Sequence, residues 1–202
     1  MYTYGYLFYI PVTLAALIFF VIRGYCRKLD NIYYVFAFIA VVYINVAVKE
    51  AFFPMFMMDI PDFTIWNNIN YLPRPGYFLS SHALLNIMMT VPIGCGIQYL
   101  FDLERKKRWM LGILLGTMFE VIQLVILVWI QPHDMFVDVN VLIANILGVL
   151  IGTGIVSIFN RLVIKFLSNN SKSRNRFWKY IYTVAENCLS GRSSLKGLAK
   201  RS

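Results

Sequence analysis

The chain has 202 residues, of which 59% are hydrophobic and only 14% are charged, and its formal net charge is +9. A soluble domain of this length could not bury so much apolar surface behind so few polar groups, so the composition excludes a soluble protein and predicts a membrane protein. The three cysteines (Cys26, Cys95 and Cys188) show no pairing pattern, so no disulfide framework is expected.

Hydropathy predicts five membrane-spanning segments, at residues 4–22, 32–48, 81–101, 109–130 and 138–159. A helix of about 20 residues rises roughly 30 Å, which is the thickness of the hydrocarbon core. We therefore predict an all-α, polytopic transmembrane helix bundle. The first segment lacks a basic n-region and a cleavage site, so we expect it to be retained rather than removed as a signal peptide.

The basic residues predict the orientation of the bundle. Three Lys or Arg lie in the turn after the first segment, four lie in the turn after the third, and ten lie from Arg161 onward, so 17 of the 19 share one side. By the positive-inside rule this side is cytoplasmic, which places the N-terminus outside and the C-terminus inside. Because the charge reports topology and suits anionic lipid, we expect no nucleic-acid partner.

The chain divides into four predicted parts. Residues 1–48 hold two transmembrane helices, residues 49–80 form an extracellular loop, residues 81–160 form a three-helix core, and residues 161–202 form a basic cytoplasmic tail. Apolar residues recur at helical spacing in the tail, which favours an amphipathic helix on the inner leaflet; a solvated tail is an equally weighted alternative. They are Phe177, Ile181, Val184, Cys188 and Leu189.

One carboxylate, Glu120, stands near the middle of the apolar run 109–130, and Gln123 follows it three residues later on the same helical face. An acid at membrane depth costs about 2.5–3.5 kcal/mol on insertion scales and normally faces a bundle interior or a hydrated cavity. Glu120 is therefore the leading candidate for a functional residue.

Other polar residues are predicted to reach a similar depth. Gln123 and Asn145 each lie seven residues from the outer end of their segment, roughly 10 Å deep, with Asn86 slightly shallower and Glu120 slightly deeper. We expect these four to line one cavity that opens outward, with Asp138 at its mouth. The alternative for the amides is simple hydrogen bonding between helices, which is worth about 0.6 kcal/mol for each bond.

Small residues accompany these polar residues. Gly112 and Gly116 precede Glu120 at intervals of four, and Gly148 and Gly152 follow the same spacing on the fifth segment. Such pairs let helix backbones approach closely, either within the chain or between two copies of it. We expect helix packing at all four, with a homo-oligomer as one outcome.

Other chemistry has weaker signals. His82, His133 and Asp134 lie on the outer side but lack metal-ligand spacing, so we expect no metal, and no cofactor fingerprint occurs. Ser80 and Ser81 are explained as the N-terminal cap of the third segment. Arg74 and Lys49 are the outer-side cations, and either could counter the acids or hold an anionic headgroup.

Several of these residues stand in a pattern that resembles the VanZ-like membrane proteins. Asn86-x5-Pro92-x-Gly94, Glu120-x-x-Gln123, Asp138-x-Asn140-x4-Asn145-x-x-Gly148 and Asn70-x-x-Pro73 are similar to the family's motifs in order and spacing. Two positions depart from the pattern: Met135 stands where the family usually has Arg, and Asn140 stands where it usually has Asp.

The resemblance implies a multi-pass protein of the bacterial plasma membrane that is associated with tolerance to teicoplanin-type glycopeptides. We expect an outward cavity that binds a membrane lipid, a lipid-linked precursor or another cell-wall-related ligand, with Glu120 and Asp138 as candidate catalytic residues. Gln123, Asn86, Asn145, Asn140 and Arg74 are the expected ligand-binding residues. One alternative is an enzyme that modifies a lipid-linked or glycan precursor with Glu120 as general acid or base. A weaker alternative is a proton-coupled transporter.

Overall fold

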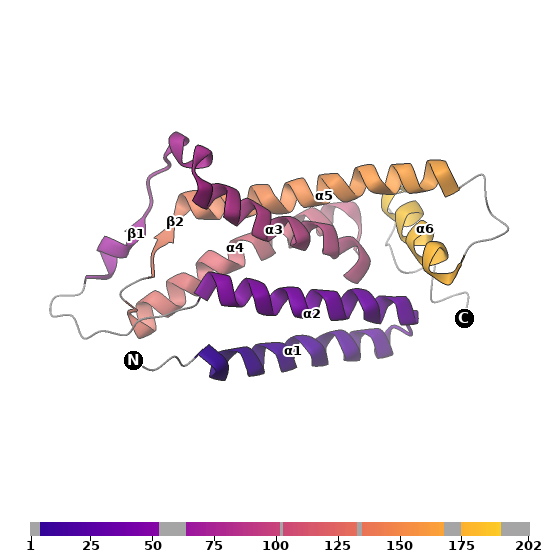
Figure 1. Ribbon diagram of the computed structural model, residues 1–202, viewed down its shortest axis with the longest axis horizontal. Helices are drawn as coiled ribbons and strands as arrows, with labels where there is room; N and C mark the ends of the chain where they lie inside the picture. Colours follow the sequence, from indigo (N-terminus) through magenta and orange to yellow (C-terminus); the bar gives the residue numbers. More distant parts are fainter. Residues whose placement is uncertain (1–4, 53–63, 102, 133–134, 168–174, 191–202) are drawn as a thin grey trace.

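The structure is a computed structural model that describes residues 5–52, 64–101, 103–132, 135–167 and 175–190. The chain is helical through most of these residues, and Figure 1 shows long helices side by side with a shorter helix across one end. The helices are α1 (Gly5–Cys26), α2 (Asn31–Phe52), α3 (Ser81–Leu100), α4 (Arg105–Ile130), α5 (Val139–Leu167) and α6 (Arg176–Leu189).

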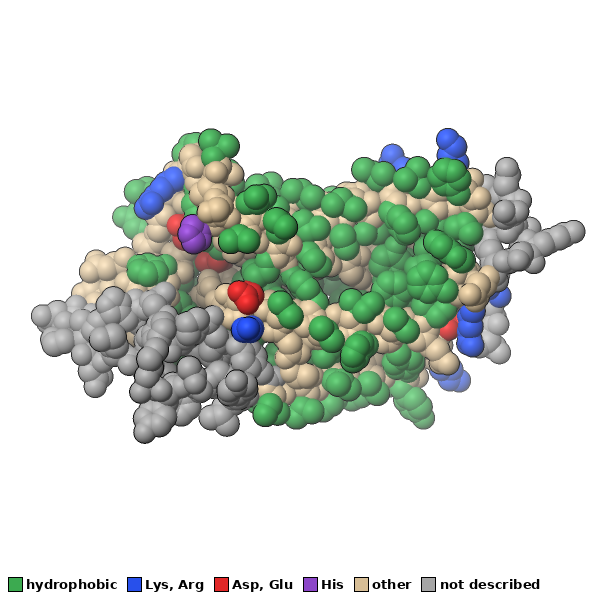
Figure 2. Space-filling view, viewed as in Figure 1, with side chains coloured by type: hydrophobic (Ala, Val, Ile, Leu, Met, Phe, Trp, Pro, Cys, Tyr) green, Lys and Arg blue, Asp and Glu red, His purple; other side chains and the backbone are tan. Residues whose placement is uncertain are grey.

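The expected all-α membrane bundle of about five spans is confirmed. By length and composition, α2, α3, α4 and α5 can each cross a membrane. Helix α1 has 22 residues, and its described side chains from Ile10 to Cys26 form a further apolar stretch. Large apolar side chains are exposed along the flank of the bundle, where a soluble protein would place polar groups (Figure 2).

Helices α1, α2, α4 and α5 all extend beyond the apolar runs that predict them. Helix α4 begins at Arg105 rather than residue 109, and α5 continues to Leu167, so the expected part boundary at residue 160 lies inside a helix. The added residues include Arg161 and Lys165. Lys and Arg favour helices and extend their charged ends to the membrane surface, so the helices continue beyond the apolar core.

The centre of the bundle is the contact between α3 and α5. Gly148 of α5 lies against Ile87 and Thr90 of α3, and an added methyl group at Gly152 would collide with the carbonyl oxygen of Val91. Helix α3 is capped by Ser80, whose hydroxyl accepts a hydrogen bond from the N–H of Ala83 at 3.2 Å, as the cap assignment predicts.

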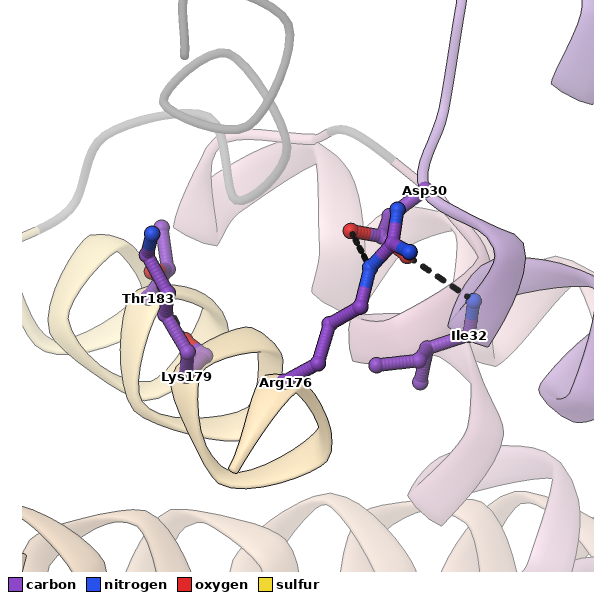
Figure 3. A network of polar contacts seen from close by, with 5 residues as sticks. All are labelled: Asp30, Ile32, Arg176, Lys179 and Thr183. Atoms are coloured by element: carbon purple, nitrogen blue, oxygen red, sulfur yellow. Dashed lines mark hydrogen bonds and ion pairs between the residues drawn. The ribbon is translucent and has the colours of Figure 1, made fainter. Parts of the chain in front are cut away.

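Helix α6 occupies the tail segment and packs against the basic end of the bundle. The Tyr180 hydroxyl donates to the carbonyl of Tyr99 at 3.0 Å, and Val184 is fully buried. Arg176 Nε lies 3.3 Å from Asp30 Oδ2, an ion pair that joins α6 to the turn between α1 and α2 (Figure 3). The buried face of α6 differs slightly from the expected apolar face, since Phe177 is exposed. The residues of the buried face are Tyr180, Ile181, Val184, Ala185 and Cys188.

The opposite end carries the described part of the connection between α2 and α3, residues 64–80. It contains two short 3-10 helices, η1 (Ile65–Asn68) and η2 (Pro75–Leu79), with the two-residue strand β1 (Ile69–Asn70) between them. Strand β1 pairs in parallel with β2 (Val137–Asp138), just before α5. This pairing places the connection over the ends of α4 and α5, as Figure 1 shows at the left.

Candidate functional site

A polar cavity of about 180 Å³ lies near the end of the bundle that is away from the basic residues. The four residues expected to converge all line it, Asn86 from α3, Glu120 and Gln123 from α4, and Asn145 from α5. Figure 2 shows acidic side chains around a hollow toward the left-hand end of this face. The described residues of the lining are Glu50, Ala51, Asn86, Met89, Phe119, Glu120, Gln123, Phe136, Val141 and Asn145.

Glu120 is buried, with 5% of its surface exposed. Its Oε2 accepts a hydrogen bond from the backbone N–H of Asp138 at 3.3 Å. Within the described part of the chain, no Lys, Arg or His forms an ion pair with it. A buried carboxyl without a cation is costly to maintain for packing alone, so this geometry points to a site that a ligand or a proton completes.

Two of the amides use their N–H groups within the protein. Gln123 Nε2 donates to the carbonyl of Ala51 at 2.9 Å, which joins α4 to the end of α2. Asn86 Nδ2 donates to the carbonyl of His82 at 2.9 Å and to the Tyr77 hydroxyl at 3.4 Å. Burial raises the pKa of that Tyr77 hydroxyl above its ordinary value, so it stays protonated. Both side chains line the cavity, and their amide oxygens accept no hydrogen bond from the described residues.

Asn145 is the most deeply buried amide of the site. It is 1% exposed, and its Oδ1 has no hydrogen-bond partner among the described residues. A buried acceptor without a donor costs about 1–3 kcal/mol. The cavity is therefore rich in acceptors, and it suits a group that donates several hydrogen bonds or carries positive charge.

The other predicted residues form a clamp beside the cavity, which we call the loop clamp: Asp138 and Asn140 with the Asn70 side chain and the backbone of Leu72 and Arg74. Asn70 Nδ2 donates to Asp138 Oδ2 at 2.9 Å, and Asn140 Nδ2 donates to Asp138 Oδ1 at 2.7 Å. Asn140 also accepts from the Arg74 N–H at 2.7 Å and donates to the Leu72 carbonyl at 3.1 Å. None of these side chains lines the cavity; Arg74 contributes its backbone and exposes its side chain.

The comparison with protein families decides where the chain belongs. A family model described as VanZ/LLP1 matches residues 6–160. The chain belongs to the VanZ/LLP1 family. No curated protein and no solved structure matches it. The matched region contains every residue of the cavity and the loop clamp of this VanZ/LLP1 protein, and it ends before α6.

Glu50 is the charged cavity residue that sequence reasoning did not select. It lies in the last turn of α2, is exposed, and contributes a second carboxylate to the lining. Its position on the outer side was visible in the sequence. Its direction toward the cavity was not, because that depends on how α2 is rotated against α4.

The four glycines of this VanZ/LLP1 chain make contacts within the chain. A methyl group added at Gly112 would lie 2.9 Å from a Val149 side-chain carbon, and one at Gly116 would lie 3.3 Å from the Asn145 carbonyl oxygen, both on α5. Gly148 and Gly152 face α3 instead, as described above. Gly94 of α3 was not predicted for packing, yet a methyl group there would collide with the Val149 carbonyl oxygen.

Metal ligation has no support in the part of the chain that the structure describes. It contains no cluster of three or more His, Cys, Asp or Glu side chains placed to hold an ion. His133 and Asp134, two of the three residues considered from the sequence, lie outside the described residues.

Proposed function

We propose that this VanZ/LLP1 protein is a bacterial envelope protein whose polar cavity binds the headgroup of a membrane lipid, a lipid-linked precursor or another cell-wall-related ligand. Occupancy of the cavity alters the response of the cell to teicoplanin-type glycopeptides. The observation that carries the proposal is the buried, unpaired Glu120 beside the unpartnered Oδ1 of Asn145 in a cavity at the predicted outer end.

The volume limits what the cavity can hold. About 180 Å³ is less than the roughly 300–1,000 Å³ typical of sites for drug-sized ligands. A headgroup fragment, such as one with an ammonium group or several hydroxyls, fits this volume and supplies the donors that the acceptors lack. The remainder of a lipid would lie outside, along the apolar flank of the bundle.

Expression in a glycopeptide-susceptible bacterium tests the role of Glu120. We expect the wild-type protein to raise the minimum inhibitory concentration of teicoplanin. Glu120→Gln and Glu120→Ala should insert normally and return this concentration to the level of the empty vector, because both remove the carboxylate. Immunoblotting of membrane fractions checks insertion.

Glu104→Gln is the matched control, since Glu104 is an exposed acid that precedes the first residue of α4, at the end of the helix away from the cavity. It should keep wild-type tolerance. Full tolerance in both Glu120 variants, at normal membrane levels, would contradict the proposed role of the acid.

A second candidate function is favoured by Glu50. Two carboxylates that line one cavity suit acid and base roles in the modification of a lipid-linked or glycan precursor. Mass spectrometry of lipids and muropeptides would then show a species that follows wild-type expression and disappears in both Glu50→Gln and Glu120→Gln. An unchanged profile on expression of the wild-type protein would rule out this enzymatic function.

A further inference from the structure

A second cavity, which we call the arginine cavity, lies at the basic end of the bundle and is not used by the proposed function. Its volume is about 380 Å³, and it is enclosed by α3, α4, α5 and α6. Three arginines line it, Arg105 and Arg108 from α4 and Arg161 from α5. None of the described residues that line it is an Asp or Glu.

Arg108 is the central cation of this cavity. It is only 6% exposed, although a guanidinium is always charged. Its Nη1 donates to Gln98 Oε1 at 3.4 Å and its Nη2 donates to the carbonyl of Leu103 at 3.1 Å, while Nε has no partner among the described residues. No carboxylate of the described chain forms an ion pair with it. A buried cation that is held only by neutral acceptors is poorly compensated.

Gln98 supplies a second unused donor in the same lining. It is 1% exposed, and its Oε1 accepts from both Arg108 and, at 2.9 Å, Asn160 Nδ2. Its Nε2 is buried and has no partner among the described residues. The unsatisfied groups of this cavity are thus donors, whereas Asn145 in the polar cavity around Glu120 has an unsatisfied acceptor.

None of the remaining described lining residues neutralises the positive charge of the arginines. Arg105 Nη2 reaches the carbonyl of Leu189 at 3.3 Å, and Arg161 is exposed at the rim. Burial raises the pKa of the Cys188 thiol despite the nearby Arg108, so this group stays neutral and does not act as a counter-ion. Trp109, 39% exposed, adds an aromatic ring of the kind enriched at membrane interfaces.

We propose that the arginine cavity binds a phosphate group, with Arg108 and Gln98 as donors at its base and Arg105 and Arg161 at its rim. Guanidinium groups pair with phosphate through two parallel hydrogen bonds, which a lysine cannot match. The phosphate can come from an anionic lipid headgroup of the basic-side leaflet or from a soluble phosphate compound. A phosphoglycerol headgroup suits the volume, the interfacial tryptophan and the predicted cytoplasmic side.

The experiment measures binding to the purified full chain by native mass spectrometry. One arm adds phosphatidylglycerol, a second adds phosphatidylcholine, and a third adds inorganic phosphate or ATP without anionic lipid. The variants are Arg161→Gln and Arg108→Gln. Lys106→Gln is the control. Lys106 is an exposed cation in the same turn of α4 as Arg108, but its side chain does not line the cavity.

We expect phosphatidylglycerol to bind more tightly than phosphatidylcholine, and each arginine substitution to weaken it roughly tenfold to hundredfold, as the loss of a charge-assisted hydrogen bond predicts. Lys106→Gln should change the affinity less than twofold. Arginine-dependent binding of inorganic phosphate or ATP, without preference for the anionic lipid, would support the phosphate site and assign it to a soluble compound.

The proposal is overturned if no phosphate-bearing probe binds the wild-type chain, or if Arg161→Gln binds every such probe as well as Lys106→Gln does. Arg161 is exposed, so this variant decides the question even where the buried Arg108→Gln does not fold.

Discussion

At the scale of residues, glycines set how closely α3 and α5 approach. Gly152 and Gly154 stand two positions apart on α5 but face different surroundings. A methyl group at Gly152 would collide with the Val91 carbonyl oxygen of α3, whereas one at Gly154 would meet nothing within 4 Å. The pair therefore separates close packing from the general effect of replacing glycine in a helix.

Gly152→Ala should destabilise the bundle by about 1–3 kcal/mol, because backbone atoms must move to admit the methyl group. Gly154→Ala should be neutral or slightly stabilising, since alanine favours helices and the space is open. Thermal unfolding of the purified protein in one detergent compares the two variants. Equal midpoints would show that the glycine contact is not needed.

At the scale of elements, the loop clamp joins two segments that are far apart in the chain. Asn70 pairs with Asp138, 68 positions later, through both the β1–β2 bridge and a side-chain hydrogen bond. Strand β2 also places the Asp138 N–H against Glu120. The clamp thus holds residues 70–74 against Asp138, whose backbone N–H contacts Glu120 of the polar cavity, so Asp138 has a structural task in addition to any contact with a ligand.

Asp138→Ala should loosen residues 69–74, because it removes the acceptor for Asn70 and Asn140 but keeps the N–H that Glu120 uses. Hydrogen exchange followed by mass spectrometry should show faster exchange in this segment and unchanged protection in α3 and α5. Asn67→Ala, at an exposed side chain of η1, is the control. Unchanged exchange at residues 69–74 would show that the clamp does not hold the loop.

At the scale of the whole molecule, charge and cavities divide between two ends. The basic turns, α6 and the arginine cavity share one end, and the acceptor-rich cavity lies at the other. Figure 2 shows most of the visible Lys and Arg side chains at the right-hand end. With 17 of 19 basic residues on one side, the positive-inside rule predicts that this end is cytoplasmic.

Cysteine labelling checks this orientation. Cys26 is exposed at the basic end of α1, and a variant that keeps it as the single cysteine should react with a membrane-impermeant maleimide only after the cells are permeabilised. Leu72→Cys, in a background without other cysteines, should react in intact cells because residue 72 is exposed at the opposite end. The reverse pattern of labelling would show that the protein has the opposite orientation in the membrane.

The sequence by itself determined the class of protein, the helices, and which polar residues share a depth. The lengths of the apolar runs suffice to predict the class of protein and its helices. A rise of about 1.5 Å per residue relates position along a helix to depth. The convergence of Glu120, Gln123, Asn86 and Asn145 could therefore be anticipated.

Only the tertiary structure decided which side of each helix faces which neighbour. The rotation of a helix depends on packing against all its partners, so it brought Glu50 into the cavity and directed Gly148 and Gly152 toward α3 rather than α4. The parallel pairing of β1 with β2 is non-local, and it engaged the side chain of Asp138 in the loop clamp. Depth follows from local geometry, but contact is a property of the assembled bundle.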